Sequence, residues 1–257
     1  MTLAAMPNIL DRTIVIGAPP ETVFRFFTDN ARWAAWLGAG STIDARAGGK
    51  VYIRHPNAVE AIGEVLEIVP PERIVFTYGF VSGQPMPPGA SKVTIRLVRD
   101  PDGTRLTLVH EFTDTGARDH HIQGWRYQLS VFANVVADEV QAGAAQAADR
   151  WFEVWSIPDA AERERALREV ASPQLRFRDR FGATDGIADL VPHIGAAQHF
   201  MPGMTLHRVG DVRQCQGTAL VDWTAAGPDG QPRGSGTNVF VFGPDGRIVS
   251  VIGFWRR

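Results

Sequence analysis

Four side chains in the first half of the chain join an apolar ring to a polar tip. They are Tyr52, Tyr78, His110 and Trp125. Such side chains are typical of ligand sites, because the ring fills apolar space while the hydroxyl, imidazole or indole N–H orients the guest. The same residue types also occur in solid cores, where the polar tip satisfies a neighbouring carbonyl. The sequence leaves both interpretations open.

Three histidines of the second half, His193, His199 and His207, are of a type that binds metal ions. Their spacing does not place two of them one helical turn apart on one face, so we expect no metal. The Gly-rich segments 38–40 and 234–236 do not join a strand to a helix as a phosphate-binding loop does. We therefore expect no nucleotide and no other cofactor.

The composition excludes several classes of protein. The 257 residues include 26 Lys+Arg and 28 Asp+Glu without a basic run, so we expect no nucleic-acid partner. No apolar segment reaches the ~20 residues that span a bilayer, so we expect no membrane partner. Cys215 is the only cysteine, which excludes an intramolecular disulfide and favours a cytoplasmic location.

Hydrophobic periodicity predicts the elements that position the candidate side chains. After a short strand and two short helices, the first half has strands at 51–54, 61–69 and 74–80 and two more around 93–97 and 106–112. From Ile122 to Val140 the period changes from two to 3.6, which predicts a long helix. An apolar helix stripe must cover the apolar face of the antiparallel sheet, and a curved sheet leaves a cavity between them.

The second half begins with helices and ends with a sheet. Helices are predicted at 151–155, 160–170 and 187–198, with a strand at 175–178 before the last of them. Four β-rich segments follow at 205–214, 218–225, 237–242 and 247–255, separated in part by Pro-Asp-Gly turns. We predict an α+β fold for each half, with domains at 1–141 and 142–257.

The first half resembles the family named for homology to the activator of Hsp90 ATPase, within the Bet v 1-like helix-grip superfamily. The matching words run in family order: Ala18-Pro19-Pro20-Glu21-Thr22-Val23-Phe24, Thr28-Asp29, Gly48-Gly49, Gly63-Glu64-Val65-Leu66-Glu67, Pro70-Pro71-Glu72-Arg73, Gly103-Thr104-Arg105-Leu106 and Gly124-Trp125. The resemblance implies a curved antiparallel sheet around a long C-terminal helix and a pocket for a small hydrophobic ligand. We assign Trp36, Leu129 and Phe132 to that pocket as well. The words are mostly turn and core positions, so we do not expect Hsp90 as a partner.

The second half looks like the NTF2-like group, which includes ketosteroid isomerases and SnoaL-type polyketide cyclases. The matching words are Phe177-Arg178-Asp179, Gly186, Asn238-Val239-Phe240-Val241-Phe242, Asp245-Gly246-Arg247-Ile248 and Gly253-Phe254-Trp255. The resemblance implies an α+β cone with Asp179 as general base and Asn238 as an oxyanion donor. Trp151 stands where the group has a tyrosine. Trp155, Trp223 and Phe240 are expected to line the pocket.

Three functional hypotheses follow. The first is binding of a small hydrophobic or aromatic molecule, in stress response or secondary metabolism. The second is cofactor-free isomerisation or cyclisation of a polyketide- or steroid-like carbonyl compound, with Asp179 taking the proton. The third is a homodimer or protein-interaction surface on the NTF2-like domain, where Val249 and Val251 beside Trp255 either form the interface or line the core.

Overall fold

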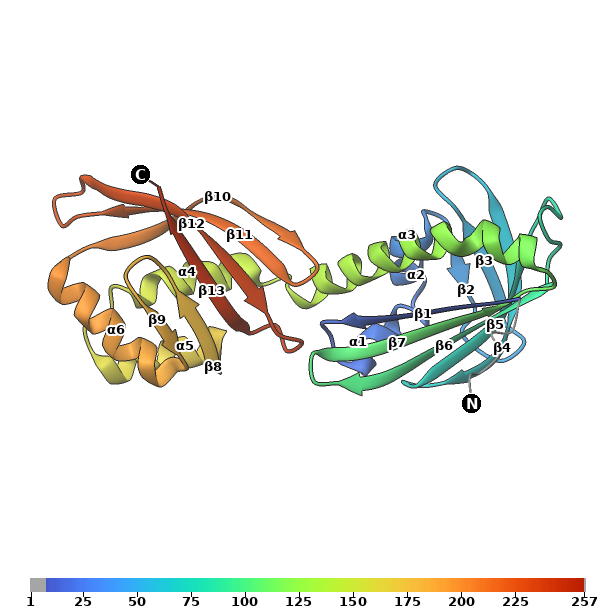
Figure 1. The fold of residues 1–257 in the computed structure, drawn as a ribbon, viewed down its shortest axis with the longest axis horizontal. Helices are drawn as coiled ribbons and strands as arrows, with labels where there is room; N and C mark the ends of the chain where they lie inside the picture. The colour runs from blue at the N-terminus through green and yellow to red at the C-terminus, as the bar shows by residue number, and fades with distance from the viewer. Residues whose placement is uncertain (1–7, 257) are drawn as a thin grey trace. The chain divides into compact units, whose positions relative to one another are not determined.

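The computed structural model describes residues 8–256 and shows a mixed α+β protein with two sheets. The chain forms two compact units that divide between Val136 and Ala137, a few residues before the predicted boundary. The division lies inside helix α3 (Thr115–Val140). The α+β class is confirmed (Figure 1).

The first unit is built on a seven-stranded antiparallel sheet with the order β1-β7-β6-β5-β4-β3-β2. Its strands are β1 (Ile9–Ile16), β2 (Thr42–Ile43), β3 (Lys50–Arg54), β4 (Glu60–Val69), β5 (Arg73–Phe80), β6 (Ser91–Asp100) and β7 (Gly103–Glu111). The helices are α1 (Pro20–Arg25), α2 (Asn30–Leu37) and α3. Consecutive pairing from β2 to β7 confirms the predicted meander, and α3 lies across the sheet (Figure 1).

An aromatic cluster joins α3 to the two short helices and to the sheet. Phe132 of α3 lies 5.2 Å from Phe27 and 4.8 Å from Trp36, measured between ring centroids. Trp33 extends the cluster to Phe76 of β5 at 5.9 Å. These rings are almost fully buried, and burying a large aromatic side chain is a major source of stability.

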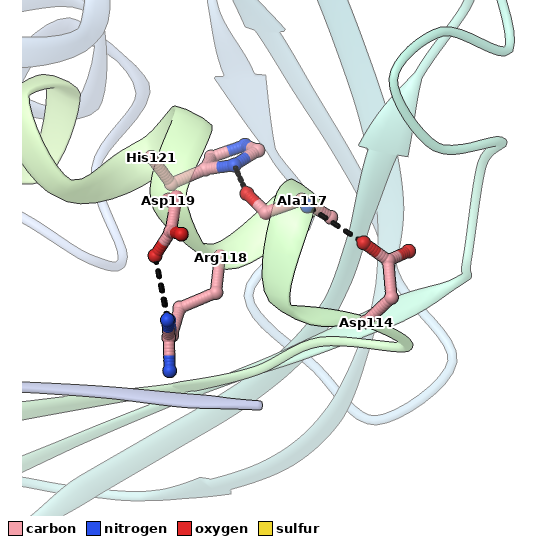
Figure 2. A network of polar contacts seen from close by, with 5 residues as sticks. All are labelled: Asp114, Ala117, Arg118, Asp119 and His121. Atoms are coloured by element: carbon pink, nitrogen blue, oxygen red, sulfur yellow. Dashed lines mark hydrogen bonds and ion pairs between the residues drawn. The ribbon is translucent and has the colours of Figure 1, made fainter. Parts of the chain in front are cut away.

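Helix α3 begins seven residues before the predicted start at Ile122. The Asp114 carboxylate accepts a hydrogen bond from the Ala117 N–H at 2.8 Å, as an N-cap residue does (Figure 2). This bond holds the pKa of the Asp114 carboxyl below its usual value. The first turns carry polar residues and a glycine, so the apolar period alone did not reveal them.

Gly103 opens β7 at a point where three backbone segments meet. It adopts a positive φ of 127°, and a β-carbon there would overlap the carbonyl oxygen of Ile16 and lie 2.7 Å from the amide nitrogen of Ala18. The next residue, Thr104, is buried and donates its hydroxyl to the Ala18 carbonyl at 2.6 Å. The Gly-Thr pair therefore fastens the end of β1 to the sheet.

The second unit has a six-stranded sheet with the order β10-β11-β12-β13-β8-β9. Its strands are β8 (Ala171–Arg178), β9 (Ala183–Asp185), β10 (Thr205–Cys215), β11 (Thr218–Ala226), β12 (Pro232–Phe242) and β13 (Ile248–Trp255). The pairing of β13 with β8 is parallel, and the other pairs are antiparallel. The two predicted Pro-Asp-Gly hairpins join β11 to β12 and β12 to β13.

Helices α4 (Ala144–Val154), α5 (Ala160–Val170) and α6 (Ile187–Phe200) pack against this sheet (Figure 1). Trp151 and Phe152 of α4 are buried against Phe240 of β12. The Arg208 guanidinium holds both carboxylate oxygens of Asp149, at 2.8 and 2.9 Å, which fixes α4 to β10. The position of α4 is thus set by both apolar and charged contacts.

Within residues 8–256, no helix combines the length and the apolar character that crossing a membrane requires.

We expect Gly103→Ala to lower the free energy of unfolding of the first unit by about 2–4 kcal/mol, because the methyl group collides with backbone. Gly83→Ala is the matched control, since Gly83 also has a positive φ, of 78°, but its β-carbon would meet nothing within 4 Å. Its expected cost is about 1 kcal/mol. Urea unfolding of both variants measures the difference, and equal losses would contradict this account of Gly103.

Candidate functional site

The second unit encloses a cavity of about 490 Å³ between the helices and the sheet. Its walls are mostly aromatic and aliphatic, which suits a small apolar guest. The residues that line it include Trp151, Trp155, Phe177, Asp179, Phe181, His193, Ala197, Trp223, Asn238, Gly253 and Trp255.

The strand order brings Asp179 and Asn238 together around Gly253. Asn238 of β12 lies directly opposite Gly253 of β13. Asp179 follows Arg178, which is paired with Ile252 on the other side of β13. A β-carbon on Gly253 would lie 3.2 Å from Asn238 Oδ1 and 3.2 Å from Asp179 Cβ. The missing side chain of Gly253 therefore leaves space between a carboxylate and an amide.

The Asp179 carboxylate is held by three N–H donors. Its Oδ1 accepts from the backbone N–H groups of Phe181 at 2.8 Å and Gly182 at 3.0 Å. Its Oδ2 accepts from the Trp255 indole at 3.2 Å. These bonds fit the turn-forming role of an aspartate, and they also fix the carboxylate at the cavity wall with one acceptor position left, on Oδ2.

The Asn238 amide is oriented by Trp223. The Trp223 indole N–H donates to Asn238 Oδ1 at 3.0 Å, and an indole nitrogen can only donate, so the amide atom facing it must be the oxygen. Within residues 8–256 no other hydrogen bond engages the Asn238 side chain. Its NH₂ group is thus available to donate to a guest.

The structure places most of the predicted second-half residues at this cavity. Trp151 lines it while packing on Phe177 and Phe240, each with a ring-centroid distance of 5.9 Å. Trp155 and Trp223 line it as well. Phe240 does not, because its ring is buried in the core behind Trp151 and Phe152.

Sequence reasoning missed His193 and Trp255 as parts of this wall. His193 was considered only as a metal ligand, yet it packs beside Phe177, 5.7 Å between ring centroids. Trp255 lies 4.7 Å from Trp223 and bonds Asp179. The position of His193 on the predicted helix 187–198 gave only a weak indication that it faces the cavity. The contact of Trp255 with Asp179 depends on the order of the strands in the sheet.

The first unit has a second cavity, of about 390 Å³, between α3 and the strands β3 and β5. Of the predicted ligand residues, Tyr78 and Trp125 line it. The lining also includes side chains that sequence reasoning missed: Ile53, His55, Val59, Phe80, His120, His121, Tyr127 and Gln128. Three lining residues of α3 follow a pattern visible in the sequence, because His121, Trp125 and Gln128 are spaced at i, i+4 and i+7 and so share one helix face.

His110 lies behind the cavity wall in a chain of hydrogen bonds. The Trp125 indole donates to His110 Nδ1 at 2.9 Å, so the proton of the neutral ring is on Nε2, which lies 2.8 Å from Ser91 Oγ. Ser91 in turn donates to the Tyr78 carbonyl at 2.8 Å. Burial first, and then the nearby His121, lower the pKa of His110 to about 2. His110 therefore positions Trp125 as a neutral group.

The other predicted first-half residues do not reach the cavity. Trp36, Leu129 and Phe132 are buried in the core, where Phe132 belongs to the aromatic cluster. The Tyr52 hydroxyl donates to Glu60 at 2.6 Å, away from the cavity lining. Sequence periodicity identifies the buried face of an element, but it does not separate residues that fill space from residues that border it.

The part of the chain that the structure describes holds no group of three His, Cys, Asp or Glu side chains arranged for a metal ion.

Residues 17–137 match the model of the family described as "Activator of Hsp90 ATPase homolog 1-like protein". The first unit resembles this family. The resemblance predicted for the first half is therefore confirmed over that range, and it includes every strand of the first sheet after β1. No curated protein matches the chain.

The comparison with solved structures finds proteins that match about half of this chain. A SnoaL-like family protein from Agrobacterium tumefaciens is 23% identical, with a TM-score of 0.42, over 44% of this chain and 96% of its own. Protein CV1439 from Chromobacterium violaceum is 29% identical, with a TM-score of 0.41, over 50% of this chain and 96% of its own. The Aha1 dimer from Colwellia psychrerythraea is 16% identical, with a TM-score of 0.41, over 47% and 90%.

The first unit should lose stability in acid because His110 is protonated only after unfolding. Its pKa is about 2 when folded, whereas an unfolded histidine has a pKa of about 6.5, so the unfolded state binds the extra proton between these values. We expect a loss of about 2 kcal/mol from pH 7 to pH 5 from this group.

Urea unfolding of the first unit at the two pH values, in the wild type and in His110→Phe, measures this contribution. The variant is expected to be less stable at pH 7, because Trp125 and Ser91 lose a partner, but to depend less on pH. Equal pH dependence in both proteins would exclude His110 as the titrating group.

Proposed function

We propose that the second unit binds a small, neutral, mostly apolar molecule with a carbonyl group. The observation that carries this proposal is the placement of Asp179 and Asn238 on one apolar cavity, on either side of Gly253. The Asn238 NH₂ group is a suitable donor to a carbonyl oxygen. The Asp179 carboxylate repels an anionic guest, and among the described residues that line the cavity there is no Lys or Arg to offset it.

We expect 2-acetylnaphthalene to bind more tightly than 2-ethylnaphthalene, by about 3- to 10-fold, because only the ketone can accept a hydrogen bond from Asn238. The measurement is an NMR titration of the full chain that follows signals of the second unit. Similar affinities for the two probes would contradict the assigned role of Asn238.

Two variants of α6 locate the binding site. Ala197 lines the cavity and is half-buried, so Ala197→Trp should fill the space and weaken ketone binding by about tenfold or more. His199 is exposed on the same helix outside the lining, so His199→Trp should leave the affinity unchanged. Unaltered binding by Ala197→Trp would place the ketone elsewhere.

A second candidate function, proton transfer at the carbon next to the carbonyl, is favoured by the separate orientation of the two polar groups. Asp179 takes the proton, the electron pair of the broken C–H bond moves through the carbonyl to its oxygen, and Asn238 donates a hydrogen bond to that oxygen. Trp151 lines the same space and is the proposed third member of the set. In a ketone that carries a C=C bond next to this carbon, returning the proton to the far end of that bond shifts the double bond and completes an isomerisation without a cofactor.

This candidate predicts that the protein accelerates exchange of the ketone's α-hydrogens for deuterium in D₂O. Asp179→Asn should slow the exchange by about 10²- to 10⁴-fold, the range for a lost general base. Asp185→Asn is the control, because Asp185 is an exposed carboxylate of the same unit. Exchange at the uncatalysed rate in the wild type would leave the second unit as a binding domain.

For the whole chain, we propose a helix-grip domain followed by an NTF2-like cone, each holding a hydrophobic guest. The match of residues 17–137 supports the first part, and the cavity between three helices and a mixed sheet supports the second. A role in stress response or secondary metabolism, a cytoplasmic location and the absence of an Hsp90 partner stay predictions.

Homodimerisation through the second unit also stays a prediction. Val251 is buried in the core and Trp255 lines the cavity, so the predicted dimer face is not formed by them. The exposed apolar side chains of β13 are instead Ile252 and Phe254. A mass measurement in solution distinguishes a dimer from a monomer.

A further inference from the structure

One face of α3 supplies both aromatic and polar groups to the cavity of the first unit. His121, Trp125 and Gln128 lie on this face at helical spacing, opposite Tyr78 and Phe80 of β5. The rings form flat apolar walls, which suit an aromatic guest. Within the described range, the lining contains no Lys, Arg, Asp or Glu, so a charged guest would find no counterion.

Gln128 is a polar side chain of this wall whose amide has no protein partner among residues 8–256. Its side chain is nearly fully buried and lines the cavity. In the part of the chain that the structure describes, no hydrogen bond engages its amide. The amide borders the cavity, where a guest or water can satisfy it, and the carboxamide offers a donor group and an acceptor atom side by side.

His121, the other buried polar side chain of this helix face, is left as an acceptor only. The Ala117 carbonyl accepts from His121 Nδ1 at 2.7 Å (Figure 2), so the neutral ring keeps its lone pair on Nε2, which is buried without a partner among residues 8–256. Burial lowers the pKa of His121. On the sheet side, the Tyr78 hydroxyl lies 3.2 Å from His55 Nε2. Among the buried side chains that α3 presents to the cavity, Gln128 is thus the one that can both donate and accept.

We propose that this cavity binds a neutral aromatic molecule whose edge carries an adjacent donor and acceptor, as in a ring lactam, and that Gln128 is the residue that recognises this edge. The lactam N–H donates to Gln128 Oε1 while its carbonyl accepts from the Gln128 NH₂ group. This site lies in the other unit from the ketone site, and the inference rests on the proposal that the first unit holds a hydrophobic guest.

The test uses the full chain and two probes of nearly equal shape, 2-quinolone and 2-methoxyquinoline. Only the quinolone has the N–H beside a carbonyl. Two neutral hydrogen bonds predict a preference for 2-quinolone of about tenfold in the wild type. Gln128→Leu should bind both probes equally, and Gln123→Leu, which removes an exposed glutamine of the same helix, should keep the preference.

An NMR titration that follows the Gln128 side-chain amide assigns the effect to this site and decides the matter if Gln128→Leu does not fold. A shift of that signal with 2-quinolone and not with 2-methoxyquinoline supports the proposal. Equal affinity for the probes in the wild type, a preference that persists in Gln128→Leu, or no binding of either probe at about 1 mM overturns it. The Ala197→Trp variant should retain the preference, which separates this result from a failure of the ketone site.

Discussion

The first unit depends on the contact of Phe132 with the rings of Phe27 and Trp36. This contact fixes the C-terminal part of α3 against the short helices, and Trp33 carries the packing through to the sheet. Side chains that are packed as closely as these rings leave no room for a guest. The N-terminal part of the same helix, around Gln128 and His121, instead borders open space. One helix thus forms a solid core at one end and a cavity wall at the other.

The second unit also combines a packed core with a cavity, but its strands are arranged differently. Trp151 and Phe240 fill the space beneath the sheet, while the parallel pairing of β13 with β8 brings Asp179 beside a strand that would otherwise form an edge. Asn238 of β12 and Asp179, which follows β8, therefore lie on either side of β13. Each is oriented by an indole N–H, from Trp255 for Asp179 and from Trp223 for Asn238.

Local patterns were sufficient to predict most of the fold. Alternation and helical periodicity identify every strand of more than three residues and every helix, because each element buries a single apolar face. They missed β2 and β9, which are too short to show a period. They also placed the start of α3 too late, since its first turns are defined by the Asp114 cap and carry little apolar character.

The candidate sites were predicted less completely, for a physical reason. A residue that lines a cavity and one that fills the core have the same pattern and the same burial, as Trp125 and Phe132 show on one helix. The resemblance to the NTF2-like group placed Asp179 and Asn238 in the sequence, but their meeting around Gly253 depends on strand order. To recognise Gln128 and His121 as site residues, one must know which buried side chains lack a hydrogen-bond partner, and the sequence does not show this.

Gly253 has a consequence for how such a pocket diversifies. A methyl group at this position would lie between the side chains of Asp179 and Asn238, at 3.2 Å from an atom of each. The backbone there has an ordinary φ, so the fold itself does not demand a glycine. A single change of this glycine to alanine would therefore occupy the space between the two groups, while the acid, the amide and the indoles that hold them all remain in place.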